Sequence, residues 1–254
     1  MEFEIWQIGI LIVAAFLGGF IDAIAGGGGL ICLPALMAVG IPVHVALATN
    51  KLQGSFGTFA STITFTKKGY INFKDIYLGI IFTFLGTVLG VGLVLFINDK
   101  FLKFIIPFLL IGIVFYTIFS PNLGEIQKEA KMNKNTFFVI FGFVLGFYDG
   151  FFGPGTGSFW TFSLMGILGY TMKNAVANTK VLNFTSNIAA LIVFTFAGEI
   201  LWKIGILMGI AQMLGSYIGS NLVIKKDVKF IKTLFLAMVV VTILKIFLDI
   251  FKNS

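Results

Sequence analysis

Long apolar runs alternate with short polar breaks along almost the whole chain. Uncharged runs such as 76–98 and 204–224 reach the roughly 20 residues that a helix needs to cross a bilayer. Runs bounded by lysines and turn residues predict helices at 5–25, 30–39, 45–65, 76–97 and 102–119, then at 137–152, 158–168, 175–196, 204–224 and 230–251. The second segment of each half is too short to span. We predict an all-α, polytopic membrane protein with about 8 to 10 helical segments.

A carboxylate followed by glycines interrupts the first apolar run, and the pattern returns in the second half. Asp22 precedes Gly26-Gly27-Gly28-Gly29, and Asp149 precedes Gly153-Pro154-Gly155-Thr156. Ala48-Thr49-Asn50-Lys51 matches Ala177-Asn178-Thr179-Lys180 in the same order. These matches indicate a duplicated chain. We predict a first transmembrane repeat at 1–120, a cytoplasmic linker at 121–135 and a second transmembrane repeat at 136–254.

The positions of the lysines predict how the two repeats are oriented. Cytoplasmic loops of membrane proteins are enriched in basic residues. The connection at 67–74 is rich in lysine, whereas the equivalent connection at 198–203 holds only Lys203. Equivalent connections would then face opposite sides of the membrane, which is the arrangement of inverted repeats with discontinuous, Gly-rich helices.

Composition narrows the class of protein further. The chain is 58% hydrophobic and 11% charged, with a mean hydropathy of +1.01, whereas charged residues make up about 25% of soluble domains. This composition predicts a multi-pass protein of the cell (inner or cytoplasmic) membrane, with the lipid bilayer as its surroundings. The net charge of +7 comes from lysines in short loops, so we expect no nucleic acid partner. The oligomeric state is not specified by the sequence.

No cofactor, metal centre or enzymatic site is predicted. One cysteine and one histidine are too few for a Cys/His metal cluster or a disulfide framework. The four glycines are not followed by Lys-Ser or Lys-Thr, so they do not match a nucleotide-binding loop. No catalytic set of Ser, His and Asp can be assembled, and we expect that the chain is not an enzyme.

Four charged residues are predicted to lie inside the membrane: Asp22, Asp149, Lys51 and Lys180. Placing each charge at the membrane centre costs at least about 2.5 to 3.5 kcal/mol on insertion scales. Each is therefore expected to pair with an opposite charge or to take part in function. One interpretation is a pair of structural ion pairs. The other is that the lysines attract an anionic substrate while Asp22 or Asp149 carries a coupling proton, with Asp22 preferred because four glycines follow it.

The glycine stretches predict helix breaks at membrane depth. Such breaks are tolerated only where they line a cavity or lie buried in protein. The short helices that follow would present N–H groups and positive dipole ends, which suit an anion; a glycine turn for close packing is the alternative. Polar residues surround the two lysines and would line a path or bond neighbouring helices: Thr49, Asn50, Gln53, Ser55, Asn178, Thr179, Asn183, Ser186 and Asn187. The pairs Gly86/Gly90, Gly142/Gly146 and Gly215/Gly219 predict helix contacts.

These motifs resemble the TauE/SafE sulfite exporters, also called toluene sulfonate uptake permeases. The resemblance covers nearly the whole chain. It implies about eight helices from a duplicated unit that moves sulfite, sulfonates or related sulfur-containing anions. The positions that match the family motifs are Asp22, Gly26, Gly28, Pro34, Asn50, Lys51, Asp149, Gly153, Pro154, Gly155, Asn178 and Lys180. The second copy reads Ala-Asn-Thr-Lys, so Asn178 need not take the role of Asn50.

We therefore expect secondary transport of a small anion, with protons as the coupling ion. An anion channel and a membrane scaffold or receptor without transport are the alternatives. The expected substrate-binding residues are Gly26, Gly27, Gly28, Gly29, Thr49, Asn50, Lys51, Gly153, Pro154, Gly155, Thr156, Asn178, Thr179 and Lys180.

Overall fold

The computed structural model describes residues 3–106, 108, 112 and 129–226, and all of its regular elements in these ranges are helices. They are α1 (Ile5–Ala25), α2 (Gly29–Ala38), α3 (Val43–Lys67), α4 (Phe73–Leu95), α6 (Lys134–Phe151), α7 (Thr156–Gly166), α8 (Met172–Ala197) and α9 (Trp202–Lys225). Residues 99–106 are also helical. The predicted all-α class is confirmed. The segment expected at 230–251, and most of the one expected at 102–119, lie outside the described residues.

Several helices begin at polar residues that precede the apolar run. The side chain of Asn72 accepts a hydrogen bond from the Lys74 backbone N–H at 3.2 Å, so α4 begins before the apolar run at 76. Thr171 caps α8 in the same way, by accepting from the Asn174 N–H at 3.4 Å. Such caps satisfy N–H groups that have no partner within the helix.

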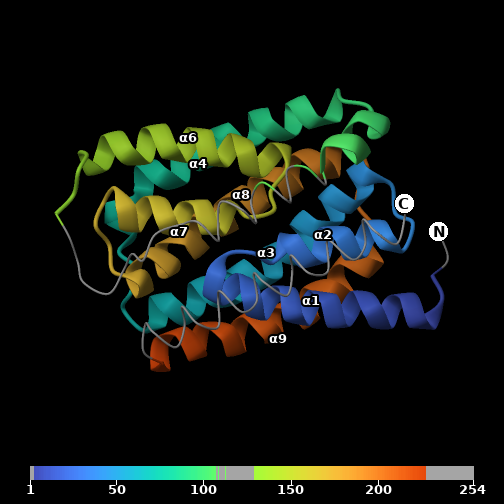
Figure 1. The fold of residues 1–254 in the computed structure, drawn as a ribbon, viewed down its shortest axis with the longest axis horizontal. Helices are drawn as coiled ribbons and strands as arrows, with labels where there is room; N and C mark the ends of the chain where they lie inside the picture. Colours follow the sequence, from blue (N-terminus) through green and yellow to red (C-terminus); the bar gives the residue numbers. More distant parts are fainter. Residues whose placement is uncertain (1–2, 107, 109–111, 113–128, 227–254) are drawn as a thin grey trace.

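Two helix pairs, each made of one helix from either half of the chain, form the outside of the bundle. α4 packs against α6, and α1 packs against α9 (Figure 1). Glycines make the contact close: a Cβ on Gly86 would lie 2.2 Å from the Phe143 carbonyl oxygen, and one on Gly215 would lie 2.0 Å from that of Phe16. The helix contacts predicted from the small-residue pairs are confirmed.

Equivalent positions of the two halves make equivalent bonds at these crossings. The Thr87 hydroxyl donates to the Gly146 carbonyl at 3.0 Å, and the Ser216 hydroxyl donates to the Gly19 carbonyl at 3.1 Å. α1 begins at the right of Figure 1 and α6 at the left, so these two matching helices run in opposite directions. These features agree with duplication; that the two repeats face opposite sides of a membrane stays a prediction.

Among the described helices, α1, α4, α8 and α9 are long and apolar enough to cross a membrane. Their outward faces carry large apolar side chains such as Leu89 and Leu214, which are 56% and 54% exposed in the isolated chain. Surfaces of this kind are suited to lipid, so the chain is a multi-pass membrane protein. α3 and α8 lie inside the bundle, in contact with each other.

Candidate functional site

The two glycine breaks meet in the middle of the bundle. α1 ends before Gly26, which has a left-handed φ of 76°, and Gly155 precedes α7 with a φ of 82°. A Cβ on Gly26 would lie 2.3 Å from the Gly157 carbonyl carbon, and a Cβ on Gly29 would lie 3.2 Å from Pro154 Cα. Glycine is needed here because the two backbones touch. The positive N-terminal ends of α2 and α7 therefore lie side by side.

Two buried ion pairs cross between the halves of the chain. Lys51 Nζ lies 2.8 Å from Asp149 Oδ1, and Lys180 Nζ lies 3.1 Å from Asp22 Oδ2. Lys180 also donates to the Asp22 backbone carbonyl. None of these four side chains is more than 10% exposed. The ion pairs that one interpretation of the sequence expected are therefore present in this conformation, each between an aspartate of one repeat and the lysine of the other.

The two carboxylates have different surroundings. Asp149 accepts a hydrogen bond from the Thr156 hydroxyl at 3.0 Å and another from the Ser186 hydroxyl, in addition to its lysine. Asp22 has a backbone donor, the Gly28 N–H, at 3.5 Å. Bonds from N–H and O–H groups stabilise the charged form of a carboxylate. Asp149 therefore has two such donors besides its lysine, whereas Asp22 has one.

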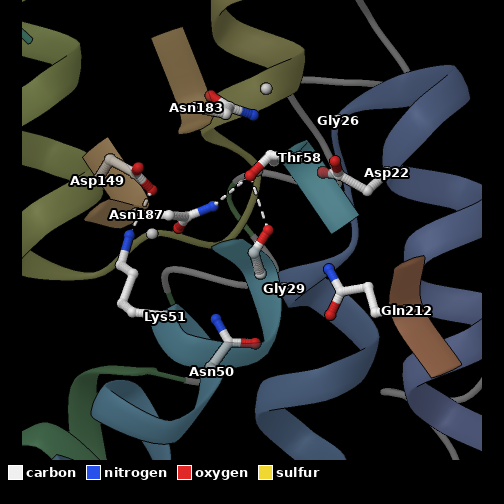
Figure 2. A pocket seen from close by; sticks show the side chains of 14 residues that line it. Asp22, Gly26, Gly29, Asn50, Lys51, Thr58, Asp149, Asn183, Asn187 and Gln212 are labelled. Carbon is white, nitrogen blue, oxygen red and sulfur yellow. Dashed lines mark hydrogen bonds and ion pairs between the residues drawn. The ribbon is translucent and has the colours of Figure 1, made fainter. Parts of the chain in front are cut away.

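A cavity of about 40 Å³ lies between the glycine breaks and these ion pairs (Figure 2). At roughly 10 to 15 Å³ per water molecule it has room for about three. Its lining combines charged groups, amides, one hydroxyl and bare backbone: Asp22, Gly26, Gly29, Asn50, Lys51, Gly54, Thr58, Asp149, Gly153, Gly155, Gly157, Asn183, Asn187 and Gln212.

Two amides in this lining have buried oxygens without a hydrogen-bond partner among the described residues. They are the oxygens of Asn183 and Gln212, whose side chains reach the cavity from α8 and α9 (Figure 2). By contrast, Asn187 donates to the Thr58 hydroxyl at 3.3 Å. Since buried polar atoms in proteins are nearly always paired, these amides indicate a site that takes water or a ligand.

The structure brings together part of the predicted site. The cavity is lined by the predicted Gly26, Gly29, Asn50, Lys51, Gly153 and Gly155, and by Asp22 and Asp149. Lys180 lies beside the cavity through its bond to Asp22. Gly27, Gly28 and Pro154 lie in the breaks and Thr156 begins α7, and none of the four belongs to the lining.

Three predicted residues lie elsewhere. The Thr49 hydroxyl accepts from the Leu201 N–H at 3.2 Å, and the Thr179 hydroxyl bonds to that of Thr161 at 3.2 Å. Asn178 lines a different cavity.

Four lining residues were not predicted from the sequence as site residues: Gly54, Thr58, Gly157 and Gln212. Gln212 had a usable signal, because it is a polar residue in an apolar run one turn before the Gly215/Gly219 contact. Among the described residues, no group of three His, Cys, Asp or Glu could hold a metal ion.

The chain is similar to a family of membrane proteins and to several probable membrane transporters. The family model "Sulfite exporter TauE/SafE" matches residues 11–246. A probable membrane transporter protein of Sinorhizobium is 41% identical, over 95% of this chain and 93% of the relative. One from Haemophilus influenzae is also 41% identical, over the same shares, and one from Escherichia coli K12 is 40% identical, over 95% and 90%. No solved structure matches the chain.

Proposed function

This chain belongs to the sulfite exporter TauE/SafE family, and on that premise we propose that it is a secondary transporter of a small anion in the cytoplasmic membrane. One observation carries the proposal: Lys51 and the Lys180–Asp22 pair lie at a small buried cavity where two broken helices meet. Ionisable residues buried in a membrane commonly mark a substrate or ion pathway.

The substrate that fits this site best is a compact oxyanion such as sulfite or a small sulfonate. Lysine ammonium groups, amide N–H groups and the N-terminal ends of α2 and α7 are all donors to anionic oxygen. The cavity of about 40 Å³ favours a small ligand that replaces the water molecules. Sulfite is also the anion in the name of the family that the chain matches.

Competition for the lysines gives a route to proton coupling. Without substrate, each lysine is neutralised by an aspartate of the other repeat. An anion that binds a lysine leaves that aspartate without its cation, and a buried carboxylate without a cation favours its protonated form. Anion and proton would then load together, which reduces the charge moved across the membrane potential.

The experiment is radiolabelled sulfite transport by purified protein in liposomes. We expect saturable uptake, accumulation driven by a pH gradient, counterflow against unlabelled sulfite, and recovery of the anion chemically unchanged. A channel would show neither saturation at low concentration nor counterflow, and a scaffold would transport nothing. Conversion of the anion would point to an enzyme instead.

A further inference from the structure

A second and larger cavity lies at the end of the bundle where α4, α6 and α8 begin. Its volume is about 270 Å³. We call it the vestibule, and it is lined by Tyr70, Asn72, Asp75, Lys134, Tyr170, Asn174 and Asn178. Three helix N-termini converge on it, since Asn72 is the cap of α4, Lys134 is the first residue of α6 and Asn174 lies in the first turn of α8. Their dipoles favour negative charge.

The vestibule also contains a cation and hydroxyl donors. Lys134 Nζ lies 2.7 Å from Asp75 Oδ1, with the two side chains 38% and 48% exposed. The other oxygen of Asp75 accepts a hydrogen bond from the Asn72 amide at 3.0 Å. Burial raises the pKa of the Tyr170 hydroxyl, and the nearby Lys134 opposes this shift, so the hydroxyl stays protonated at neutral pH and can donate.

The surrounding surface is strongly basic. Lys173 Nζ donates to the Ile224 carbonyl at 3.0 Å, which brings the last turn of α9 to the start of α8. The described lysines of this end are Lys67, Lys68, Lys74, Lys131, Lys134, Lys173, Lys225 and Lys226. Its acidic residues in the same ranges are Asp75 and Glu129. A cleft bordered by one sign of charge concentrates ions of the opposite sign.

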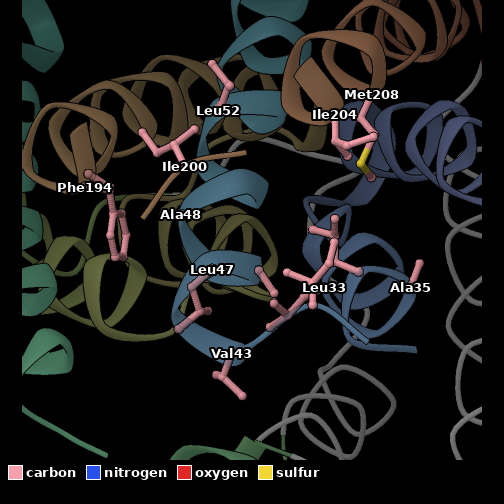
Figure 3. Packing of buried hydrophobic residues seen from close by; sticks show 14 of the residues in the cluster. Leu33, Ala35, Val43, Leu47, Ala48, Leu52, Phe194, Ile200, Ile204 and Met208 are labelled. Carbon is pink, nitrogen blue, oxygen red and sulfur yellow. The ribbon is translucent and has the colours of Figure 1, made fainter. Parts of the chain in front are cut away.

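The equivalent positions at the opposite end are closed. By the repeat that relates Lys51 to Lys180, Thr49 corresponds to Asn178, and Leu201 corresponds to Asn72. The Leu201 backbone N–H donates a hydrogen bond to the Thr49 hydroxyl, and Thr49 is fully buried. Ile204, which corresponds to Asp75, packs into an apolar cluster with Leu52 and Met208 (Figure 3). Among the described residues, the vestibule positions Asn72, Asp75 and Asn178 are therefore polar and line an open cavity, whereas their counterparts Leu201, Ile204 and Thr49 are packed together.

We propose that the vestibule is a second binding site for the transported anion, a capture site on the cytoplasmic side where Lys134 and the two tyrosine hydroxyls bind the anion in competition with Asp75. This inference rests on the proposed function. Asn178 of the vestibule and Lys180 of the central site stand two residues apart on the same helix, α8, so the vestibule lies near the central site.

The test compares two variants that break the same ion pair. Sulfite binding is measured by equilibrium dialysis on protein whose central site carries Lys51→Met with Asp149→Asn. Lys134→Gln removes the cation and should weaken the remaining binding about fivefold, a factor typical of one partly exposed charge. Asp75→Asn removes the competitor and should strengthen binding by a similar factor. Lys74→Gln, an equal change of charge outside the vestibule lining, should leave binding within about twofold.

The proposal predicts that Lys134→Gln and Asp75→Asn change sulfite binding in opposite directions. A purely structural ion pair predicts that both variants weaken binding and lower the melting temperature together, and that result would overturn the proposal. If the protein with Lys51→Met and Asp149→Asn binds no sulfite, the proposal is overturned too. It is also overturned if the vestibule binds phosphatidylglycerol and sulfite does not displace this lipid. Transport is measured separately on protein with an intact central site, so failure of the vestibule and failure of the transport function give different results.

Discussion

At the scale of single residues, the crossed ion pairs are the feature that the sequence could predict only in part. Asp22, Asp149, Lys51 and Lys180 stand out as charges within apolar segments, so their burial was predictable. Their pairing depends on how α3 and α8 lie against the breaks of the other repeat. Contacts of this range in the sequence are set by packing of the whole bundle, which no local pattern contains.

The unequal surroundings of the two carboxylates predict unequal roles. Asp22 has fewer donors than Asp149, so it is the better candidate for the coupling proton. We expect Asp22→Asn to abolish sulfite accumulation driven by a pH gradient while sulfite exchange at equal concentrations continues. Transport in liposomes with and without a gradient measures both.

Asp149→Asn is the matched comparison. This variant leaves the Thr156 and Ser186 hydroxyls without their carboxylate, so it should lower the melting temperature more than Asp22→Asn. Undiminished pH-driven uptake by both variants would show that the aspartates are structural partners of the lysines.

At the scale of elements, the apolar runs predicted where the helices lie, and polar capping residues account for where two of them begin. The first helix was predicted at 5–25 and is found at Ile5–Ala25. α4 and α8 begin about one turn before their apolar runs, because Asn72 and Thr171 cap them. The glycine breaks were predictable as breaks, but their mutual contact through Gly26 and Gly157 was not, since it joins two repeats.

The opposite directions of α1 and α6 predict that equivalent connections face opposite sides of the membrane (Figure 1). Single cysteines replace the exposed Lys68 and Lys203 in a Cys32→Ser background. In intact cells, a membrane-impermeant maleimide should label Lys203→Cys, and Lys68→Cys should react only after permeabilisation. Equal labelling of both in intact cells would rule out the inversion.

At the scale of the whole molecule, a duplicated sequence gives a symmetric centre with dissimilar ends. The two ion pairs and the two glycine-packed crossings follow the duplication. The ends do not, because Asn72, Asp75 and Asn178 are replaced by Leu201, Ile204 and Thr49 in the other copy. The matching motifs of the two halves can be found in the sequence alone, whereas the difference between the polar vestibule and its packed counterpart appears only when these residues are placed in space.

The central claim is that the buried lysines bind the transported anion. Removing Lys51 alone would leave Asp149 as an uncompensated buried charge, at a cost of about 3 to 5 kcal/mol, so loss of binding could follow from loss of the fold. The double variant Lys51→Met with Asp149→Asn removes both charges and separates stability from binding.

The most direct measurement is radiolabelled sulfite binding by this double variant in a Lys134→Gln background, compared with Lys134→Gln alone. We predict a melting temperature within a few degrees of that reference and sulfite binding at the central site weakened more than about tenfold, because close charge pairs in binding sites show coupling energies of about 1.5 kcal/mol or more. Sulfite binding equal to that of the reference, in a variant that melts at the same temperature, would contradict the account.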